Sequence, residues 1–176
     1  MRVITAIGGV PSSGKTSLVR QYLAMTDGWK PYINHSVPHL YNPFLGSYVL
    51  GIYDKKELFS GTDKFSFSIA PYALEFIKRT KGNLIFEGDR LFNSSFLEAL
   101  QSLPNTSLRI LILSADEETL RHRATTRGSD QSPTFLLGRK TKIENIKSNK
   151  TLSDCVRLAK NESRSDADKN LRWIVS

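Results

Sequence analysis

The segment Gly9-Val-Pro-Ser-Ser-Gly14-Lys15-Thr16 constrains the fold of this chain most, because it matches the whole pattern G-x-x-x-x-G-K-S/T. A β-branched run at residues 3–7 precedes it, and apolar residues at helical spacing follow over residues 15–25. The order predicts a strand, a glycine-rich loop and a helix, with backbone N–H groups converging on a phosphate at the positive end of the helix. A glycine-rich turn formed by chance is the alternative, which the motif and its context together disfavour.

The loop motif predicts a site for Mg-ATP. Lys15 would neutralise the β- and γ-phosphate oxygens, and the hydroxyl of Thr16 would be a ligand of Mg²⁺. The residues predicted to bind the nucleotide are Gly9, Ser12, Ser13, Gly14, Lys15, Thr16 and Ser17.

The rest of the chain alternates short apolar runs with helical patterns. Strands are predicted at residues 48–53, 84–86, 108–113 and 156–159, and helices at 70–80, 94–102, 116–127, 139–148 and 165–175. Alternating strands and helices predict an α/β fold of three layers, in which helices cover both faces of a parallel sheet of about five strands. A length of 176 residues fits a single domain over residues 1–176.

A second group of polar residues follows the apolar strand at residues 84–86. Glu87, Asp89 and Arg90 would lie at the carboxyl edge of the sheet, where open α/β sheets bind their ligands. Glu87 or Asp89 could hold a metal-bound water, and Arg90 could bind phosphate. A solvated strand end with a local salt bridge is the alternative.

Asp63 is a candidate general base. A carboxylate that accepts the proton of an attacking hydroxyl favours phosphoryl transfer, and Asp63 lies in a Gly-Thr turn before an apolar helix. The alternative is that Thr62, Asp63 and Ser66 cap this helix.

A basic run at residues 120–128 predicts a lid over residues 124–142. Arg123 and Arg127 are four residues apart and share a helix face, so both could reach the transferring phosphate. A solvated basic helix end is the alternative. Arg139, Lys140 and Lys142 add further cations, which could belong to the lid or follow a nucleic-acid backbone.

The overall charge favours a polyanionic partner. The chain has 25 Lys and Arg residues against 17 Asp and Glu residues, a formal net charge of +8, and the excess is concentrated after residue 120. No stretch is apolar enough to cross a bilayer and no signal peptide is evident, so a cytoplasmic protein is expected. Cys155, His35, His39 and His122 do not form a zinc motif, and Pro38 predicts that His35 and His39 lie in a surface loop.

With these motifs in order, the sequence resembles phage-encoded P-loop kinases of the nucleoside monophosphate kinase type, and more closely the 5-hydroxymethyluracil DNA kinases of thymine hypermodification. The resemblance rests on GVPSSGKTS, SGTDKFSFSIAP, EGDRLFN, RATTRG and the downstream QSPT and GRKTK, which together span most of the chain. Lys64 stands where the family motif has arginine, so no arginine role is carried over to that position.

The resemblance implies an enzyme that uses ATP to phosphorylate the hydroxymethyl group of 5-hydroxymethyluracil within DNA. Such a primary hydroxyl needs a base, which Asp63 or Asp89 would provide. A kinase for free deoxynucleosides or their monophosphates is the nearest alternative, and a P-loop binding module without transferase activity is a third. Phe59, Phe65 and Phe67 could stack on an extruded base, but core packing is the expectation for all three. No protein partner is expected.

Overall fold

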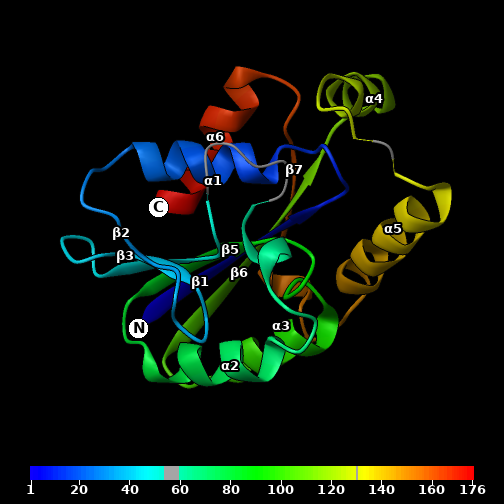
Figure 1. Cartoon of the computed structure of the whole chain (residues 1–176). Helices are drawn as coiled ribbons and strands as arrows, with labels where there is room; N and C mark the ends of the chain where they lie inside the picture. Colours follow the sequence, from blue (N-terminus) through cyan, green and yellow to red (C-terminus); the bar gives the residue numbers. More distant parts are fainter. Residues whose placement is uncertain (54–59, 130) are drawn as a thin grey trace.

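The computed structural model describes residues 1–53, 60–129 and 131–176 and arranges them in three layers around one sheet (Figure 1). Five strands run parallel in the order β4 (Ser47–Leu50), β5 (Asn83–Glu87), β1 (Arg2–Gly9), β6 (Thr106–Ser114) and β7 (Val156–Lys160). This confirms the expected parallel sheet. Two short antiparallel strands, β3 (His39–Asn42) and β2 (Lys30–Tyr32), were not predicted; they extend the sheet beyond β4 to seven strands in the described residues.

Strand β1 lies near the middle of the sheet because it is apolar on both faces. Ile4 and Ala6 are buried in the core on one face of the sheet, and Ile7 is buried in the core on the other face. Burial on both faces is typical of a central parallel strand. The loop that follows β1 is therefore held at the carboxyl edge of the sheet.

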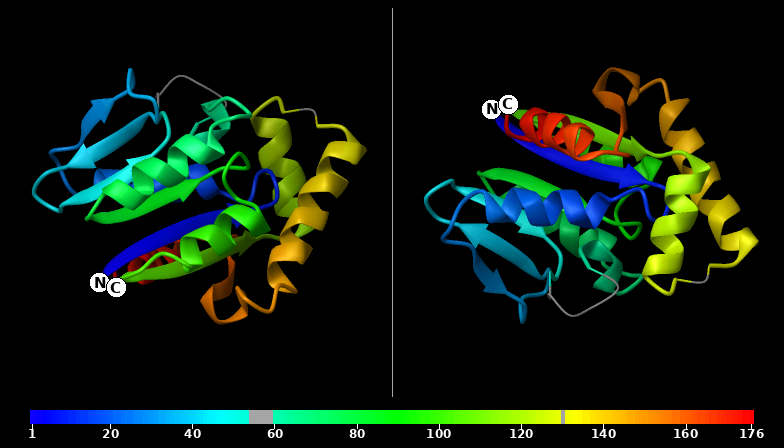
Figure 2. Two further views of the ribbon diagram at one scale, coloured as in Figure 1. Left: turned by 90° about the horizontal axis from the view of Figure 1, so that it is seen from below. Right: turned by 90° about the horizontal axis from the view of Figure 1, so that it is seen from above.

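Helices cover both faces of the sheet (Figure 2). Helices α1 (Lys15–Ala24) and α6 (Arg164–Val175) pack on one face, where Leu18, Val19 and Ile174 join the core. Helices α2 (Ala70–Arg79), α3 (Ser94–Gln101) and α5 (Pro133–Lys147) contribute to the core of the other face. None of the helices in the described ranges is long and apolar enough to cross a membrane.

Helices α4 (Glu117–Thr126) and α5 form the region predicted as a lid. Asp116 caps α4 by accepting a hydrogen bond from the backbone N–H of Thr119, at 2.7 Å. The predicted start of α5 at residue 139 was wrong by six residues, because the helix begins at Pro133. Ser132 caps the helix and Pro133 occupies its first turn, which is a common helix start.

His39 corrects a second expectation. It lies in β3, is only 5% exposed and stacks on Tyr32 at a ring distance of 5.0 Å, whereas His35 is exposed as expected. The His39 ring also lies 4.7 Å from the ring of Phe76 and 5.8 Å from that of Tyr48, so this residue is part of an aromatic cluster and not of a surface loop. Burial lowers the pKa of His39.

Candidate functional site

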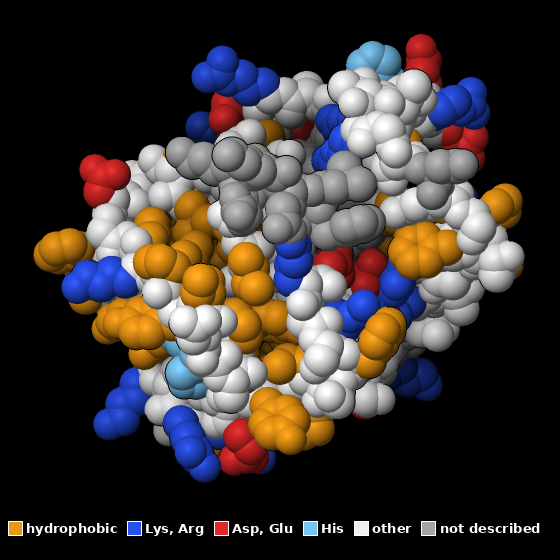
Figure 3. Space-filling model, viewed as in Figure 1, with side chains coloured by type: hydrophobic (Ala, Val, Ile, Leu, Met, Phe, Trp, Pro, Cys, Tyr) orange, Lys and Arg blue, Asp and Glu red, His pale blue; other side chains and the backbone are white. Residues whose placement is uncertain are grey.

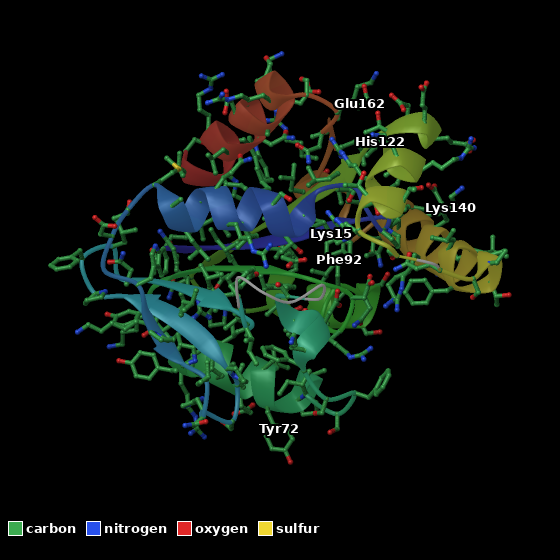
Figure 4. The ribbon with its side chains drawn as sticks, turned by 45° about the horizontal axis from the view of Figure 1, so that its top comes forward. Lys15, Tyr72, Phe92, His122, Lys140 and Glu162 are labelled. Atoms are coloured by element: carbon green, nitrogen blue, oxygen red, sulfur yellow. The ribbon has the colours of Figure 1, made fainter. Side chains whose placement is uncertain are left out.

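The loop between β1 and α1 has the backbone conformation that its glycines permit. Gly14 has φ 95°, and a Cβ atom on it would lie 2.3 Å from Nδ2 of Asn161. The ammonium group of Lys15 donates hydrogen bonds to the backbone oxygens of Gly9 (2.8 Å) and Val10 (3.1 Å). Lys15 thus lies over its own loop at the start of α1 (Figure 4), where it would meet a bound phosphate.

Two side chains from later parts of the chain, Arg123 of α4 and Asn161 after β7, form hydrogen bonds with this loop. Asn161, which follows β7, donates from Nδ2 to the backbone oxygen of Ser13 at 2.8 Å. Arg123 donates to the backbone oxygens of Ser12 (3.3 Å) and Asn161 (2.9 Å). The structure therefore places Arg123 as a brace of the loop, with its guanidinium bonded to carbonyl oxygens.

Thr16 and Glu87 meet beneath the loop. The hydroxyl of Thr16 donates to Oε1 of Glu87 at 2.9 Å, and Glu87 is 1% exposed. Burial raises the pKa of Glu87 to about 7, and the nearby charge of Lys15 opposes this rise. The carboxyl group therefore gains and loses its proton nearer to neutral pH than an exposed glutamate does.

The oxygens of Thr16 and Glu87 fit Mg²⁺ better than a metal that needs a full cage of protein ligands. Among the residues that the structure describes, no three His, Cys, Asp or Glu residues cluster as metal ligands. Mg²⁺ usually takes one or two protein oxygens and completes its shell with water and phosphate. Thr16 and Glu87 can supply those protein oxygens.

Asp63 lies on the short 3₁₀ helix η1 (Thr62–Lys64), beside Glu87 at the end of β5. Gly61 has φ 70°, and a Cβ atom on it would lie 2.3 Å from Oε1 of Glu87, so only glycine allows this close approach. Thr62 fixes the turn by donating its hydroxyl hydrogen to the backbone oxygen of Glu87, at 2.9 Å.

One oxygen of Asp63, Oδ1, accepts a hydrogen bond of 2.7 Å from the backbone N–H of Asp89. The alternative that Thr62, Asp63 and Ser66 cap α2 is wrong, because α2 begins after Ile69 without a side-chain cap. Burial, and then the neighbouring charge of Asp89, raise the pKa of Asp63. A buried carboxylate of raised basicity suits a proton acceptor.

Asp89 connects the loop of Asp63 to helix α5 of the predicted lid region. Its Oδ2 forms a salt bridge of 3.2 Å with Nε of Arg139, and its backbone oxygen accepts a hydrogen bond of 3.1 Å from Lys142. Two of the three cations predicted to bind DNA therefore point inward. Lys140, the third, lies on the exposed side of α5 (Figure 4).

Most of the predicted site residues line one cavity with a volume of about 490 Å³. Charged side chains of both signs gather in this part of the surface, with hydrophobic side chains at its margin (Figure 3). Of the predicted residues, the cavity walls include Ser12, Gly14, Lys15, Thr16, Asp63, Glu87, Asp89, Arg90, Arg127 and Arg139.

The other predicted residues lie around this cavity. Gly9 and Ser13 are buried beneath the loop, and Ser17 is exposed on α1. A neighbouring cavity of about 620 Å³ shares Gly14 and Arg127 with the first and is also lined by Ser17, Arg123 and Asn161. Arg127 thus lies between two cavities on either side of the phosphate loop.

Asn161 and Phe135 line the site but were not predicted, because neither belongs to a sequence motif. Their positions relative to the predicted elements could have indicated them: Asn161 directly follows a parallel strand, and Phe135 lies in the first turn of α5. Oδ1 of Asn161 is buried and has no hydrogen-bond partner among the described residues.

Comparisons with solved structures identify the fold. The chain is similar to a gluconokinase from Sinorhizobium meliloti 1021, with 14% identity, a TM-score of 0.50 and coverage of 99% of this chain and 95% of that one. A sugar kinase from Janibacter sp. HTCC2649 gives 12% identity, a TM-score of 0.55 and coverage of 99% and 95%. A fungal RNA kinase gives 13% identity and a TM-score of 0.53, and this chain spans 43% of its length.

No protein-family model matches the sequence, and no curated protein matches it either. The structural likenesses confirm the α/β fold. None of these three structures is a hydroxymethyluracil DNA kinase, so that closer resemblance remains a proposal.

Proposed function

We propose that this protein is an ATP-dependent kinase that phosphorylates the hydroxymethyl group of 5-hydroxymethyluracil in DNA, a step in phage thymine hypermodification. One observation carries the phosphotransferase part: the phosphate loop and the Asp63 loop meet in one cavity, with arginines of the lid region in its walls. An alcohol acceptor placed between Lys15 and Asp63 would have a phosphate on one side and a base on the other.

The residues divide the reaction among them. The loop N–H groups, Lys15 and Arg127 would hold the phosphates of ATP, and Thr16 and Glu87 would hold Mg²⁺, which neutralises phosphate charge when bound. The acceptor oxygen attacks the γ-phosphorus, the bond to the β-γ bridging oxygen breaks, and ADP leaves. The hydroxyl proton passes to Oδ2 of Asp63, since Oδ1 already accepts the Asp89 N–H.

The nucleoside end of ATP fits the neighbouring cavity beside Ser17 and Arg123. That cavity continues from Gly14 past Arg127, so a triphosphate on the loop would lead into it. Asn161 lines this cavity as well, beside the phosphate loop that its side chain supports.

The DNA substrate is supported by charge and by the family resemblance. The formal net charge of +8 exceeds what one triphosphate needs, and a polymeric anion accounts for the excess. A kinase for free deoxynucleosides or their monophosphates would use the same loop, carboxylates and lid, and is the second candidate. A P-loop switch without transfer would have no use for Asp63.

The acceptor assay separates these functions. The γ-labelled phosphate of ATP would be followed onto duplex DNA with 5-hydroxymethyluracil, ordinary duplex DNA, free deoxynucleosides and monophosphates, and gluconate as an acceptor named by a structural neighbour. We expect label on the modified DNA alone. Label only on a free nucleotide would support the second candidate, and label on no acceptor would support the switch.

A further inference from the structure

Two pairs of stacked arginine and phenylalanine side chains lie at the cavity that contains Asp63. The guanidinium carbon of Arg90 lies 3.7 Å from the ring centre of Phe67, and that of Arg139 lies 4.5 Å from the ring centre of Phe135. Arg90, Arg139 and Phe135 line the cavity, and both arginines are close to Asp89 in the chain or in space. Phe67 lies in the segment after η1 and Arg90 in the segment after β5, whereas Phe135 and Arg139 both lie on α5.

The arginines in these pairs are fixed from below. Nε of Arg90 donates to the backbone oxygen of Phe65 at 3.1 Å, and Nε of Arg139 is paired with Oδ2 of Asp89 at 3.2 Å. Each guanidinium therefore presents a flat, positively charged plane at a set position. Such planes, like aromatic rings, stack on nucleobases.

The exposed fraction of each phenylalanine shows whether its ring packs in the protein core or is accessible to a ligand. Phe65 is 5% exposed and belongs to the core, as expected, whereas Phe67 is 87% exposed, so the expectation of core packing was wrong for this residue. Phe135 is 38% exposed. Phe59 lies outside the described residues. An isolated exposed phenylalanine is ordinary, but two beside one polar cavity, each on an arginine, form a site for a flat apolar face.

We propose that Phe67 with Arg90 and Phe135 with Arg139 form an aromatic gate that holds a pyrimidine base rotated out of the DNA helix. This inference rests on the proposed function. A hydroxymethyl group on a base held between the pairs would point to Asp63 at the floor of the same cavity. A stacked base in an intact duplex exposes only its edge, so it offers no face to either pair.

The test uses the whole protein with Phe67→Ala and Phe135→Ala. Both should raise the KM for duplex DNA containing 5-hydroxymethyluracil by roughly ten- to a hundredfold, the loss that corresponds to one base stacked on an aromatic ring, and leave the KM for ATP unchanged. The Tyr variants at both positions keep the ring and should behave as the wild type. Phe44→Ala is the matched control, because Phe44 is 84% exposed in the turn before β4, at the amino edge of the sheet.

A second measurement reports on the base itself. With 2-aminopurine next to the modified base, binding of the wild type should raise the fluorescence through unstacking, and both Ala variants should lose the rise. Wild-type KM values and an unchanged fluorescence rise in both Ala variants would overturn the gate. Failure of the wild type to phosphorylate any DNA would instead reject the proposed acceptor. In that case, a base-stacking role of the two phenylalanines would require both Ala variants to raise the KM for a free nucleoside.

Discussion

At the scale of single residues, the cavity floor holds two carboxyl groups, Asp63 and Glu87, whose pKa values are both raised by burial. They differ in what surrounds them: Glu87 is bonded to Thr16, while Asp63 is bonded to the backbone of Asp89 and keeps one oxygen toward the cavity. The first arrangement suits a metal ligand and the second suits a base.

Asp89→Asn should shift the pH dependence of phosphate transfer. The charge of Asp89 raises the pKa of Asp63, so removing it lowers that pKa. Since Asp63 must be deprotonated to accept a proton, the acid limb of the kcat profile should move to lower pH. Asp154→Asn, at an exposed site on η2 (Ser153–Cys155), is the control and should leave the limb in place. A limb that stays or moves to higher pH in Asp89→Asn would contradict the proposed role of Asp63.

Glu87→Gln should change how stability depends on pH. With a pKa of about 7 in the folded state against 4.5 in the unfolded state, Glu87 binds more protons when folded, so stability falls as pH rises between these values. Glutamine carries no charge and removes this fall. The free energy of unfolding of the variant relative to wild type should thus rise by up to about 3 kcal/mol from pH 4.5 to pH 8.

Urea unfolding at both pH values without ATP or Mg²⁺ measures this difference. Glu118→Gln, on the exposed side of α4, should show little change between the two pH values. If Glu87→Gln changed the free energy of unfolding equally at pH 4.5 and pH 8, the pKa of Glu87 would not be raised in the folded protein.

Residues in contiguous motifs were predictable, and isolated ones were not. Lys15, Thr16 and Glu87 lie where the loop pattern and the strand end place them. Arg123 was expected to contact the same phosphate as Arg127. Helical spacing predicts which way a side chain points but not which group it contacts. The guanidinium of Arg123 instead donates to the carbonyl oxygens of Ser12 and Asn161. Asn161 acts through long-range contact with Ser13, which no local pattern reveals.

At the scale of elements, helix α5 supplies part of the cavity wall through Phe135 and Arg139. Its inner side is held to Asp89 by Arg139 and Lys142, and its middle carries Gly138. A glycine inside a helix lowers its stability. The start of α5 at Ser132 and Pro133 was predictable from capping rules, but the glycine and the polar residues around it obscured the helical pattern.

Gly138→Ala should stabilise the protein by up to about 1 kcal/mol, because a Cβ atom there meets nothing within 4 Å and alanine favours the helix. Urea unfolding measures the change. Gly14→Ala is the contrasting variant, since its Cβ atom would collide with Asn161 and its φ is positive, and it should destabilise. Destabilisation by Gly138→Ala would contradict the helical structure of residues 133–147.

At the scale of the whole molecule, the sequence predicted the five parallel strands because each is a short apolar run between turns, whereas β2 and β3 escaped notice. Strand β2 is the edge strand and is exposed throughout, and β3 beside it has only four residues, so neither shows the buried run that identifies β1, β5 and β6. The order of strands follows from register and crossover packing, which local patterns do not encode.

The positive charge of the molecule predicts salt-dependent binding to DNA. Affinity should fall linearly with salt on logarithmic axes, and Lys140→Gln should reduce the slope by about one if Lys140 meets a phosphate. Lys81→Gln is the control, because Lys81 is exposed before β5 at the amino edge of the sheet, away from the cavity. Fluorescence anisotropy across a salt series gives both slopes. Equal slopes for wild type and Lys140→Gln would remove Lys140 from the DNA contact.

The most direct measurement is single-turnover phosphate transfer to DNA containing 5-hydroxymethyluracil by wild type, Lys15→Ala and Asp63→Asn, with ATP affinity measured separately. We expect Lys15→Ala to lose both ATP binding and transfer, because Lys15 lies over the phosphate loop. Asp63→Asn should bind ATP as the wild type does and slow transfer by roughly 10²- to 10⁴-fold, the contribution of a positioned base. Wild-type transfer by Asp63→Asn would contradict the assignment of the base and move it to Asp89.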